Sequence, residues 1–227
     1  MKILLTNDDG YSAFGIQLLY NLLSKEHQVV IVAPNHPNSA KSVSITISEP
    51  SEVIKIDDHT FSIDGTPADS VAFGLSSLDT QFDLVISGCN HGLNVSYDTM
   101  YSGTIGATLQ ALTYEVPAIA ISSENNFNIV EKEFLNVFNY VLEHNLLSKD
   151  YSLNINFPVG DKVKAIKETH IHYRSKKEAT YYLKVAGNKY QAVRDIVDKD
   201  CSDENSDVYA VYNDIVSITK LKRTFDL

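Results

Sequence analysis

The sequence predicts a three-layer α/β/α fold, in which a mixed, mostly parallel sheet lies between two layers of helices and a β-rich extension follows at the C-terminus. Apolar runs alternate with amphipathic stretches of helical period as far as residue 146, which is the pattern of β-α-β units. Several of these runs are apolar throughout, as in strands that helices cover on both faces. With 227 residues, of which 44% are hydrophobic, the chain can bury one sizeable core, so we expect a single domain over residues 1–227.

The first β-α-β unit is predicted at the N-terminus. Residues 2–6 form an apolar run that the polar sequence NDDG ends, and residues 28–33 form a second run that Pro34 ends. Residues 14–24, between them, carry apolar side chains at helical spacing, so we expect a helix with one buried stripe. That stripe comprises Phe14, Leu18, Leu19, Leu22 and Leu23.

Residues 43–63 have a different pattern, in which apolar and polar side chains alternate. The runs VSITI, VIKI and TFSI predict short antiparallel strands with one face in water, which makes the sheet mixed. The sequence DGTPADSV then indicates a turn that enters a helix. Thr66 is the expected N-cap, Pro67 the first helical residue, and Asp69 lies near the positive end of the helix dipole.

Strands and helices continue to alternate up to residue 146. Residues 82–88 and 117–122 are predicted strands, residues 103–114 a helix of small residues, and residues 129–146 a long amphipathic helix. From residue 151 the patterns are strand-like in SLNINF, AIKETHIHYR, YYLKV and VYAVYNDIVSITKL, with a polar loop around DKDCSDENSD. We therefore expect residues from about 160 to 227 to include a β-rich extension or an oligomerisation arm.

Charge and cysteine content narrow the classes of function. Lys and Arg total 19 against 29 Asp and Glu, and the formal net charge of -10 argues against a nucleic-acid polymer as partner. The two cysteines, Cys89 and Cys201, cannot form a disulfide framework, and the apolar run at residues 2–6 is too short for a signal peptide. We expect no membrane segment and a cytoplasmic protein.

Polar loops follow three of the predicted strands. They are TNDDG, APNHPNSA and SGCNHGLN. Because ligands of open α/β sheets bind beyond the carboxyl ends of the strands, these three loops are expected to converge on one rim of the sheet.

Two adjacent carboxylates, Asp8 and Asp9, lie in the first of these loops. Like charges at that distance raise one another's pKa unless a cation holds both ionised, and oxygen ligands favour hard divalent ions. Ser39 and Asn90 would supply neutral oxygens for such a site. An ordinary Asp-Gly turn explains the dipeptide alone equally well, and a serine in a loop rich in Pro and Asn usually serves the turn.

The sequence YSGTIGA, shortly after SGCNHGLN, indicates a phosphate site. Ser102 and Thr104 lie where a helix begins, so their hydroxyls and the free amides of that turn could hold phosphate. The glycines Gly88, Gly92, Gly103 and Gly106 permit a close approach of backbone to ligand. A simple helix cap is the alternative interpretation of SGT by itself.

These motifs resemble the SurE family in order and spacing. The resemblance rests on ILLTNDDG, on APNHPNSA, on DGTPADSV at residues 64–71, on SGCNHGLN at residues 87–94 and on YSGTIGA at residues 101–107. It extends more weakly to SDVYAVYNDIVSITKL and so covers nearly the whole chain. The departures are Ser96, Ala40 and Lys41, which stand where SurE proteins frequently carry Gly.

The resemblance implies a Rossmann-like core whose C-terminal extension exchanges between subunits, giving a homodimer or homotetramer. It implies a nucleotidase that hydrolyses nucleoside 5'- and 3'-monophosphates, and some members also shorten polyphosphate. Carried over by motif, the metal ligands are Asp8, Asp9, Ser39 and Asn90, for one divalent ion, Mg or Mn, and the phosphate-binding residues are Asn94, Ser102, Gly103 and Thr104.

The expected mechanism is in-line attack of a water on phosphorus, with Asp8 or Asp9 accepting the proton. A nucleotide-binding or sensor module without catalysis is the main rival, and it predicts tight binding without phosphate release. We expect His91 to be positional and Cys89 to be a small buried filler. His170 and His172 should share one exposed strand face.

Overall fold

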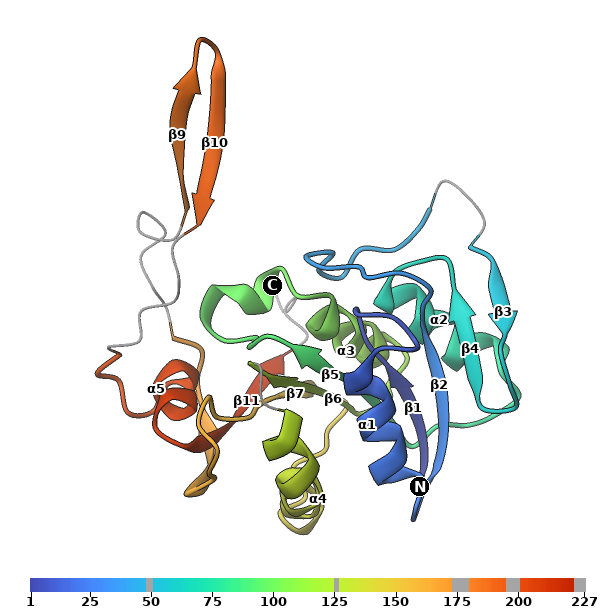
Figure 1. The fold of residues 1–227 in the computed structure, drawn as a ribbon. Helices are drawn as coiled ribbons and strands as arrows, with labels where there is room; N and C mark the ends of the chain where they lie inside the picture. The colour runs from blue at the N-terminus through green and yellow to red at the C-terminus, as the bar shows by residue number, and fades with distance from the viewer. Residues whose placement is uncertain (48–50, 125–126, 173–179, 195–200, 223–227) are drawn as a thin grey trace.

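The protein is described by a computed structural model that covers all residues except 48–50, 125–126, 173–179, 195–200 and 223–227 (Figure 1). The strands are β1 (Lys2–Thr6), β2 (Gln28–Pro34), β3 (Val53–Lys55), β4 (Thr60–Ile63), β5 (Leu84–His91), β6 (Ala118–Ser123), β7 (Tyr151–Asn156), β8 (Ala165–Thr169), β9 (Thr180–Ala186), β10 (Lys189–Arg194) and β11 (Ile215–Lys222). The helices are α1 (Phe14–Leu23), α2 (Pro67–Ser77), the 3₁₀ helix η1 (Ser96–Met100), α3 (Gly103–Thr113), α4 (Phe127–Glu143) and α5 (Asp207–Tyr212).

One sheet of nine strands organises the molecule, in the order β3-β4-β2-β1-β5-β6-β7-β11-β8. The pairs from β4 to β7 are parallel, whereas β3 is antiparallel to β4 and β11 is antiparallel to β7. The predicted α/β fold with a mixed, mostly parallel sheet is therefore confirmed. After β1 the chain adds strands on one side of β1 and then returns to place β5 on the other side. The carboxyl ends of β1 and β5 thus flank the point where the strand order reverses, which is where α/β sheets bind ligands.

The two faces of the sheet carry different helices and different cores (Figure 1). On one face, α1 and α4 pack large apolar side chains such as Ile16, Phe134 and Phe138 against the strands. On the other, α2 and α3 pack a smaller cluster that includes Ala107 and Ala111. Because alanine and glycine side chains let a helix approach closely, α3 lies near the sheet.

The buried stripe of α1 differs from the prediction at its first residue. Leu18, Leu19, Leu22 and Leu23 are buried, but the side chain of Phe14 is 66% exposed. At this turn Gly15 faces the sheet, and a Cβ on Gly15 would lie 2.0 Å from the carbonyl oxygen of Cys89. Gly15 therefore takes the position against the sheet in this turn, while the ring of Phe14 packs against that of Phe127, with the centroids 5.4 Å apart.

The strand predicted at residues 43–47 is wrong. This segment forms no ladder, and Ile45 and Ile47 are exposed. Hydrogen bonds to α2 hold it, because Thr46 donates from both its backbone nitrogen and its hydroxyl to the carboxylate of Asp69. The other two runs do form strands, β3 and β4, and these are antiparallel to each other as predicted.

The start of α2 confirms the predicted capping residues. The Thr66 hydroxyl accepts a hydrogen bond from the Asp69 nitrogen, and the Asp69 carboxylate accepts one from the Thr66 nitrogen, while Pro67 occupies the first turn. This reciprocal pair is a capping box, which satisfies two N–H groups that a helix start otherwise leaves unpaired. DGTPADSV is therefore a structural motif that begins α2 and anchors the segment around Thr46.

The C-terminal part consists of two strands of the main sheet, a separate pair of strands and the short helix α5. β8 and β11 join the main sheet, while β9 and β10 form a separate two-stranded ladder that projects from the body (Figure 1). Residues 208–212, predicted as strand, form α5 because the Ser206 hydroxyl accepts from the Tyr209 nitrogen and so caps a helix. Tyr173 and Arg174 of the predicted strand, and residues 198–200 of the predicted polar loop, lie outside the described residues. Among the described helices, none has the length and apolar character needed to cross a membrane.

Candidate active site

The turn after β1 is built by Asn7. Its side-chain amide donates to the Gly10 carbonyl oxygen at 2.9 Å, and its amide oxygen accepts from the Gly10 nitrogen at 3.1 Å. Gly10 has a φ of 107°, which a residue with a side chain rarely adopts. The two bonds fix the backbone at Asp8 and Asp9, so both carboxylates lie at the carboxyl end of the central strand.

Asp8 lies against the start of α3. Its carboxylate is buried, and the Oδ1 atom accepts a hydrogen bond of 2.7 Å from the hydroxyl of Thr104. A Cβ on Gly103 would lie 3.0 Å from the Cβ of Asp8, so glycine permits this approach. Burial raises the pKa of Asp8 to about 6, the Thr104 bond opposes the shift, and the charge of Asp9 adds to it.

Asp9 points toward the end of β5. Its Oδ2 atom accepts a hydrogen bond of 3.4 Å from the backbone nitrogen of His91. The side-chain nitrogen of the neighbouring Asn90 donates to the Gly92 carbonyl oxygen at 2.8 Å. This bond fixes the orientation of the Asn90 amide and leaves its oxygen as the atom that could bind a cation. The predicted ligand Asp9, in the loop after β1, therefore lies next to the end of β5, which carries the predicted ligand Asn90.

Ser39 lies in the loop that follows β2. The loop is tied to the first carboxylate by its backbone, since the Asn38 nitrogen donates to the Asp8 carbonyl oxygen at 2.7 Å. Farther along, Ser42 lies directly on α3, where a Cβ on Gly106 would meet the Ser42 carbonyl oxygen at 2.0 Å. Ser39 itself is exposed, so its hydroxyl is accessible to a ligand at the rim.

The predicted phosphate residues divide into two groups. Ser102 caps α3 through its hydroxyl, which accepts from the Ile105 nitrogen at 3.2 Å, and Thr104 donates to Asp8. Ser102, Gly103 and Thr104 thus form a helix N-terminus beside a carboxylate. The positive end of the helix dipole and its free N–H groups make that position suitable for an anion.

Asn94 belongs to a buried polar network that the sequence did not reveal. Its backbone carbonyl oxygen accepts from the amides of Asn154 and Asn156, at 2.8 and 3.1 Å, and its own amide donates to the Ser122 hydroxyl at 2.8 Å. Ser122 lies opposite Asn90 in the β5–β6 ladder, so the network places Asn94 next to the strand that carries Asn90. The available signal was the pair of asparagines two apart in SLNINF, because Asn is disfavoured in strands.

The predicted ligands at this rim are oxygen donors, the kind that hard divalent cations such as Mg or Mn prefer. In the described part of the chain no three His, Cys, Asp or Glu side chains could hold a metal ion by themselves, so neutral oxygens would have to complete the set. Burial is the main cause of the raised pKa of Asp8 and the charge of Asp9 adds to it, so a positive charge beside Asp8 would favour its ionised form. The hydroxyls of Thr6 and Ser87, buried below the rim on paired strands, also have no hydrogen-bond partner.

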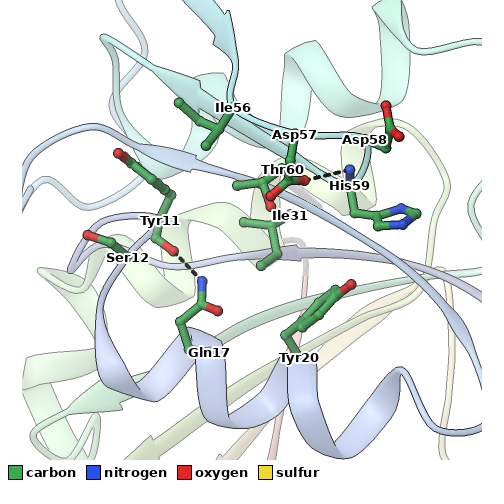
Figure 2. A pocket seen from close by; sticks show the side chains of 10 residues that line it. All are labelled: Tyr11, Ser12, Gln17, Tyr20, Ile31, Ile56, Asp57, Asp58, His59 and Thr60. Atoms are coloured by element: carbon green, nitrogen blue, oxygen red, sulfur yellow. Dashed lines mark hydrogen bonds between the residues drawn. The ribbon is translucent and has the colours of Figure 1, made fainter.

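A separate pocket of about 420 Å³ lies beside the rim (Figure 2). It is lined by Tyr11, Ser12, Gln17, Tyr20, Ile31, Ile56, Asp57, Asp58, His59 and Thr60. The lining contains two carboxylates and, among its residues, no Lys or Arg, so it repels phosphate. None of the eight predicted site residues lines this pocket.

The remaining histidines and cysteines lie outside the rim or serve packing. The ring of His91 lies 5.9 Å from that of Phe127, and Cys89 is buried, as predicted, with its thiol pKa raised by burial. His170 pairs with Asp203 at 2.7 Å, and His172 lies 3.3 Å from the sulfur of Cys201. The two histidines therefore have separate partners.

Comparison with known proteins identifies a family for this chain. The family model described as "Survival protein SurE" matches residues 3–178, a span that includes all eight rim residues. The chain belongs to the SurE family.

Individual SurE proteins support the same assignment. The chain is 38% identical over 235 residues to "5'-nucleotidase SurE" of Clostridium botulinum (strain ATCC 19397 / Type A), covering 97% of this chain and 92% of that protein. It is 36% identical to the protein of the same name from strain Eklund 17B / Type B, with 99% and 94% covered. The crystal structure of the SurE protein from Aquifex aeolicus superposes with a TM-score of 0.86 at 32% identity, covering 99% of this chain and 94% of that one.

Two departures from the SurE pattern have a common structural property. Ala40 and Ser96 have φ angles of 59° and 53°, in the left-handed region that glycine adopts without steric cost. The chain therefore keeps the backbone expected of glycine at these positions, and the surrounding contacts must stabilise it.

Proposed function

We propose that this SurE protein is a metal-dependent phosphomonoesterase that hydrolyses nucleoside 5'- and 3'-monophosphates to nucleoside and phosphate. One observation carries the proposal: the buried carboxylate of Asp8 is hydrogen-bonded to Thr104 in the first turn of α3. This hydrogen bond therefore joins the proposed cation site, at Asp8, to the proposed anion site, at the N-terminus of α3. The relatives named 5'-nucleotidase support nucleoside 5'-monophosphates as substrates.

The phosphate group would lie at the N-terminus of α3. The backbone N–H groups of Gly103 and Thr104 and the hydroxyl of Ser102 would be the donors for its oxygens. Asn94, whose amide donates to the Ser122 hydroxyl, would contribute the second proton of that amide. Donors held in place before the reaction stabilise the charge that develops on the transferring oxygens, because they need no reorganisation.

The four oxygen ligands would be the side chains of Asp8, Asp9, Ser39 and Asn90. Bound there, the divalent ion would neutralise the two carboxylates, polarise a phosphoryl oxygen and lower the pKa of a water. Asp8 and Asp9 are the carboxylates at the rim that can accept the proton of the attacking water. Asp9 is the more exposed of the two, and Asp8 is already held by Thr104.

Phosphate release tests this function directly. The purified protein is incubated with a panel of 5'- and 3'-mononucleotides and with polyphosphate, in Mg²⁺, in Mn²⁺ or in chelator. We expect release from mononucleotides with either ion and a loss of at least about a hundredfold in chelator. Tight nucleotide binding without release would support a sensor module instead, and release that chelator leaves unchanged would contradict the metal.

The projecting β9–β10 ladder carries the proposal of a homodimer or homotetramer. Leu183, Val185 and Tyr190 are large apolar side chains with 53 to 62% of their surface exposed. Exposed apolar residues on an arm are typical of association with another chain. Light scattering after size exclusion should give at least a dimer for the wild type. Replacing Leu183 and Val185 with Ser should shift the protein toward monomer, while a similar pair of changes at Ile54 and Ile56 should not.

A further inference from the structure

The loop that carries Asn94 is anchored to the C-terminal part of the chain. The backbone nitrogen of Ser96 donates to the Oδ2 atom of Asp207 at 2.8 Å, across 111 residues of sequence. The hydroxyl of Ser96 donates to the carbonyl oxygen of His172 at 2.7 Å. Both contacts join the first residue of η1 to the region beyond β8.

Asp207 is a buried hydrogen-bond centre. Its side chain is 0% exposed and accepts three backbone N–H bonds of 2.8 Å each. Oδ2 accepts from Ser96 alone, whereas Oδ1 accepts from His172 and from Val208. Burial raises the pKa of this carboxyl and the three bonds oppose that shift. Hydrogen bonds to a carboxylate are about twice as strong as neutral ones, so this centre connects three separate segments firmly.

The Ser96 anchor acts on both parts of the phosphate site. Asn94, two residues before Ser96, is held on its other side by Asn154 and Asn156. After Ser96, the hydroxyl of Thr99 donates to the Ser96 carbonyl oxygen at 2.6 Å, and η1 leads to Ser102. Ser96 has a φ of 53°, a conformation that a serine keeps only when its surroundings impose it.

We propose that Asp207 is a positioning residue, which holds residues 94–102 in the geometry that binds the phosphate of the substrate. The inference rests on the proposed function for the identity of the ligand. The contact it assigns, from the Asp207 carboxylate to the Ser96 amide, can be tested separately from catalysis. Asp207 is not a catalytic residue, because it contacts the loop and not the phosphate.

The substitution Asp207→Asn removes this contact selectively. An Asn side chain has one acceptor oxygen, which would stay with the two donors His172 and Val208, and its NH₂ group would face the Ser96 N–H, where it cannot accept. The matched control is Asp203→Asn. Asp203 lies four residues away, and its carboxylate accepts from His170 and Asn205, both within the C-terminal part.

Two measurements decide the proposal. The inhibition constant of inorganic phosphate and the KM for a mononucleotide should both rise about tenfold in Asp207→Asn, with a smaller change in kcat, and stay within about twofold in Asp203→Asn. Hydrogen exchange of the Ser96 amide should be about tenfold faster in Asp207→Asn than in the wild type. A folded Asp207→Asn with unchanged phosphate inhibition, or an equal effect in the control, would overturn the proposal.

Hydrogen exchange keeps the test independent of activity. If the wild type hydrolyses no nucleotide, the proposed function fails, yet the exchange rate of the Ser96 amide still reports the Asp207 contact. If Asp207→Asn does not fold, the wild type alone gives the answer. Its Ser96 amide should exchange at least about tenfold more slowly than an unstructured amide, and an unprotected amide would overturn the contact.

Discussion

The two faces of the sheet differ in the side chains that pack on them. The face under α1 and α4 is filled with large aromatic and aliphatic side chains, and Phe134 and Phe138 stack there with ring centroids 5.7 Å apart. The face under α2 and α3 has a smaller cluster, in which Ala107 and Ala111 of α3 pack with larger side chains such as Phe82, and the N-terminus of α3 lies beside the buried carboxylate of Asp8. The first arrangement maximises apolar burial, whereas the second brings a helix N-terminus and a loop close to Asp8. The larger core and the predicted site residues of α3 thus lie on opposite sides of one sheet.

The largest expected effect comes from Asp8→Asn on the α3 face. Activity should fall by at least about a thousandfold, because a neutral amide neither holds a cation as well nor accepts a proton. An active Asp8→Asn enzyme would contradict the assignment of Asp8, and phosphate release from mononucleotides measures it.

The same substitution should stabilise the metal-free protein. The pKa of Asp8 is raised from 3.8 to about 6, so the ionised form is disfavoured in the folded state. The stability that protonated Asp8 contributes is fully present below about pH 4 and is lost as the pH rises through about 6. In chelator at pH 7, Asp8→Asn should exceed the wild type by up to about 3 kcal/mol in urea unfolding. The two proteins should converge near pH 4, and a constant difference at every pH would contradict the raised pKa.

Phe134→Ala tests the opposite face. The side chain is 1% exposed, so the free energy of unfolding should fall by about 3 to 5 kcal/mol. Measured on the folded fraction, kcat and KM should stay within about twofold, because the face under α4 does not carry the rim. Leu135→Ala is the control, since Leu135 is 39% exposed on the same helix and its loss should cost less than about 1 kcal/mol. A large change in KM for Phe134→Ala would contradict the separation of the faces.

Gly106→Ala, in α3, should have a smaller effect than Asp8→Asn or Phe134→Ala. Alanine favours a helix over glycine by about 1 kcal/mol, but the new Cβ would meet the Ser42 carbonyl oxygen at 2.0 Å, and that atom belongs to the backbone. The clash outweighs the propensity, so the loop that carries Ser39 should shift and kcat/KM should fall by about tenfold. Gly187→Ala is the control for activity, because nothing lies within 4 Å of its added Cβ. Its φ of 53° is unfavourable for alanine and should lower stability slightly, but its kcat/KM should equal that of the wild type.

The smallest effect is expected for Ala40→Gly. The φ of 59° at Ala40 destabilises the folded state by about 1 kcal/mol, and glycine would remove this strain. Glycine also raises the entropy of the unfolded chain, which offsets most of that gain in the free energy of unfolding. The stability should therefore rise by no more than about 1 kcal/mol. Ala165→Gly, in the exposed strand β8, should instead lower it. If thermal unfolding gives the same loss for both variants, the backbone strain at Ala40 is not real.

Local patterns predicted most elements up to residue 146. The apolar runs became β1, β2, β5 and β6, and the periodic stretches became α1, α3 and α4, because burial on a sheet selects these periods directly. The prediction was wrong for two segments. Residues 43–47 alternate like a strand, but they pair with no strand and form hydrogen bonds with α2 instead. Residues 208–212 are an apolar and aromatic run typical of a strand, but the neighbouring cap at Ser206 makes them helical.

The candidate site also has parts that the sequence predicted and parts that it did not. The rim motifs were predictable because carboxyl ends of parallel strands meet at one edge, whatever the details of packing. The network around Asn94 was missed, since Asn154 and Asn156 lie in a strand pattern far along the chain. Asp207 was missed for the same reason, and only its contact with Ser96 gives it a role.

By itself, the sequence determined the α/β class, the order of its first elements and the loops that bear the polar residues, because periodicity, turns and caps are properties of neighbouring residues. The tertiary structure alone decided which atoms meet. Thr104 donates to Asp8 across 96 residues, and Ser96 to Asp207 across 111. Such bonds form only after the sheet has brought distant strand ends together, and no local pattern encodes the distance between them.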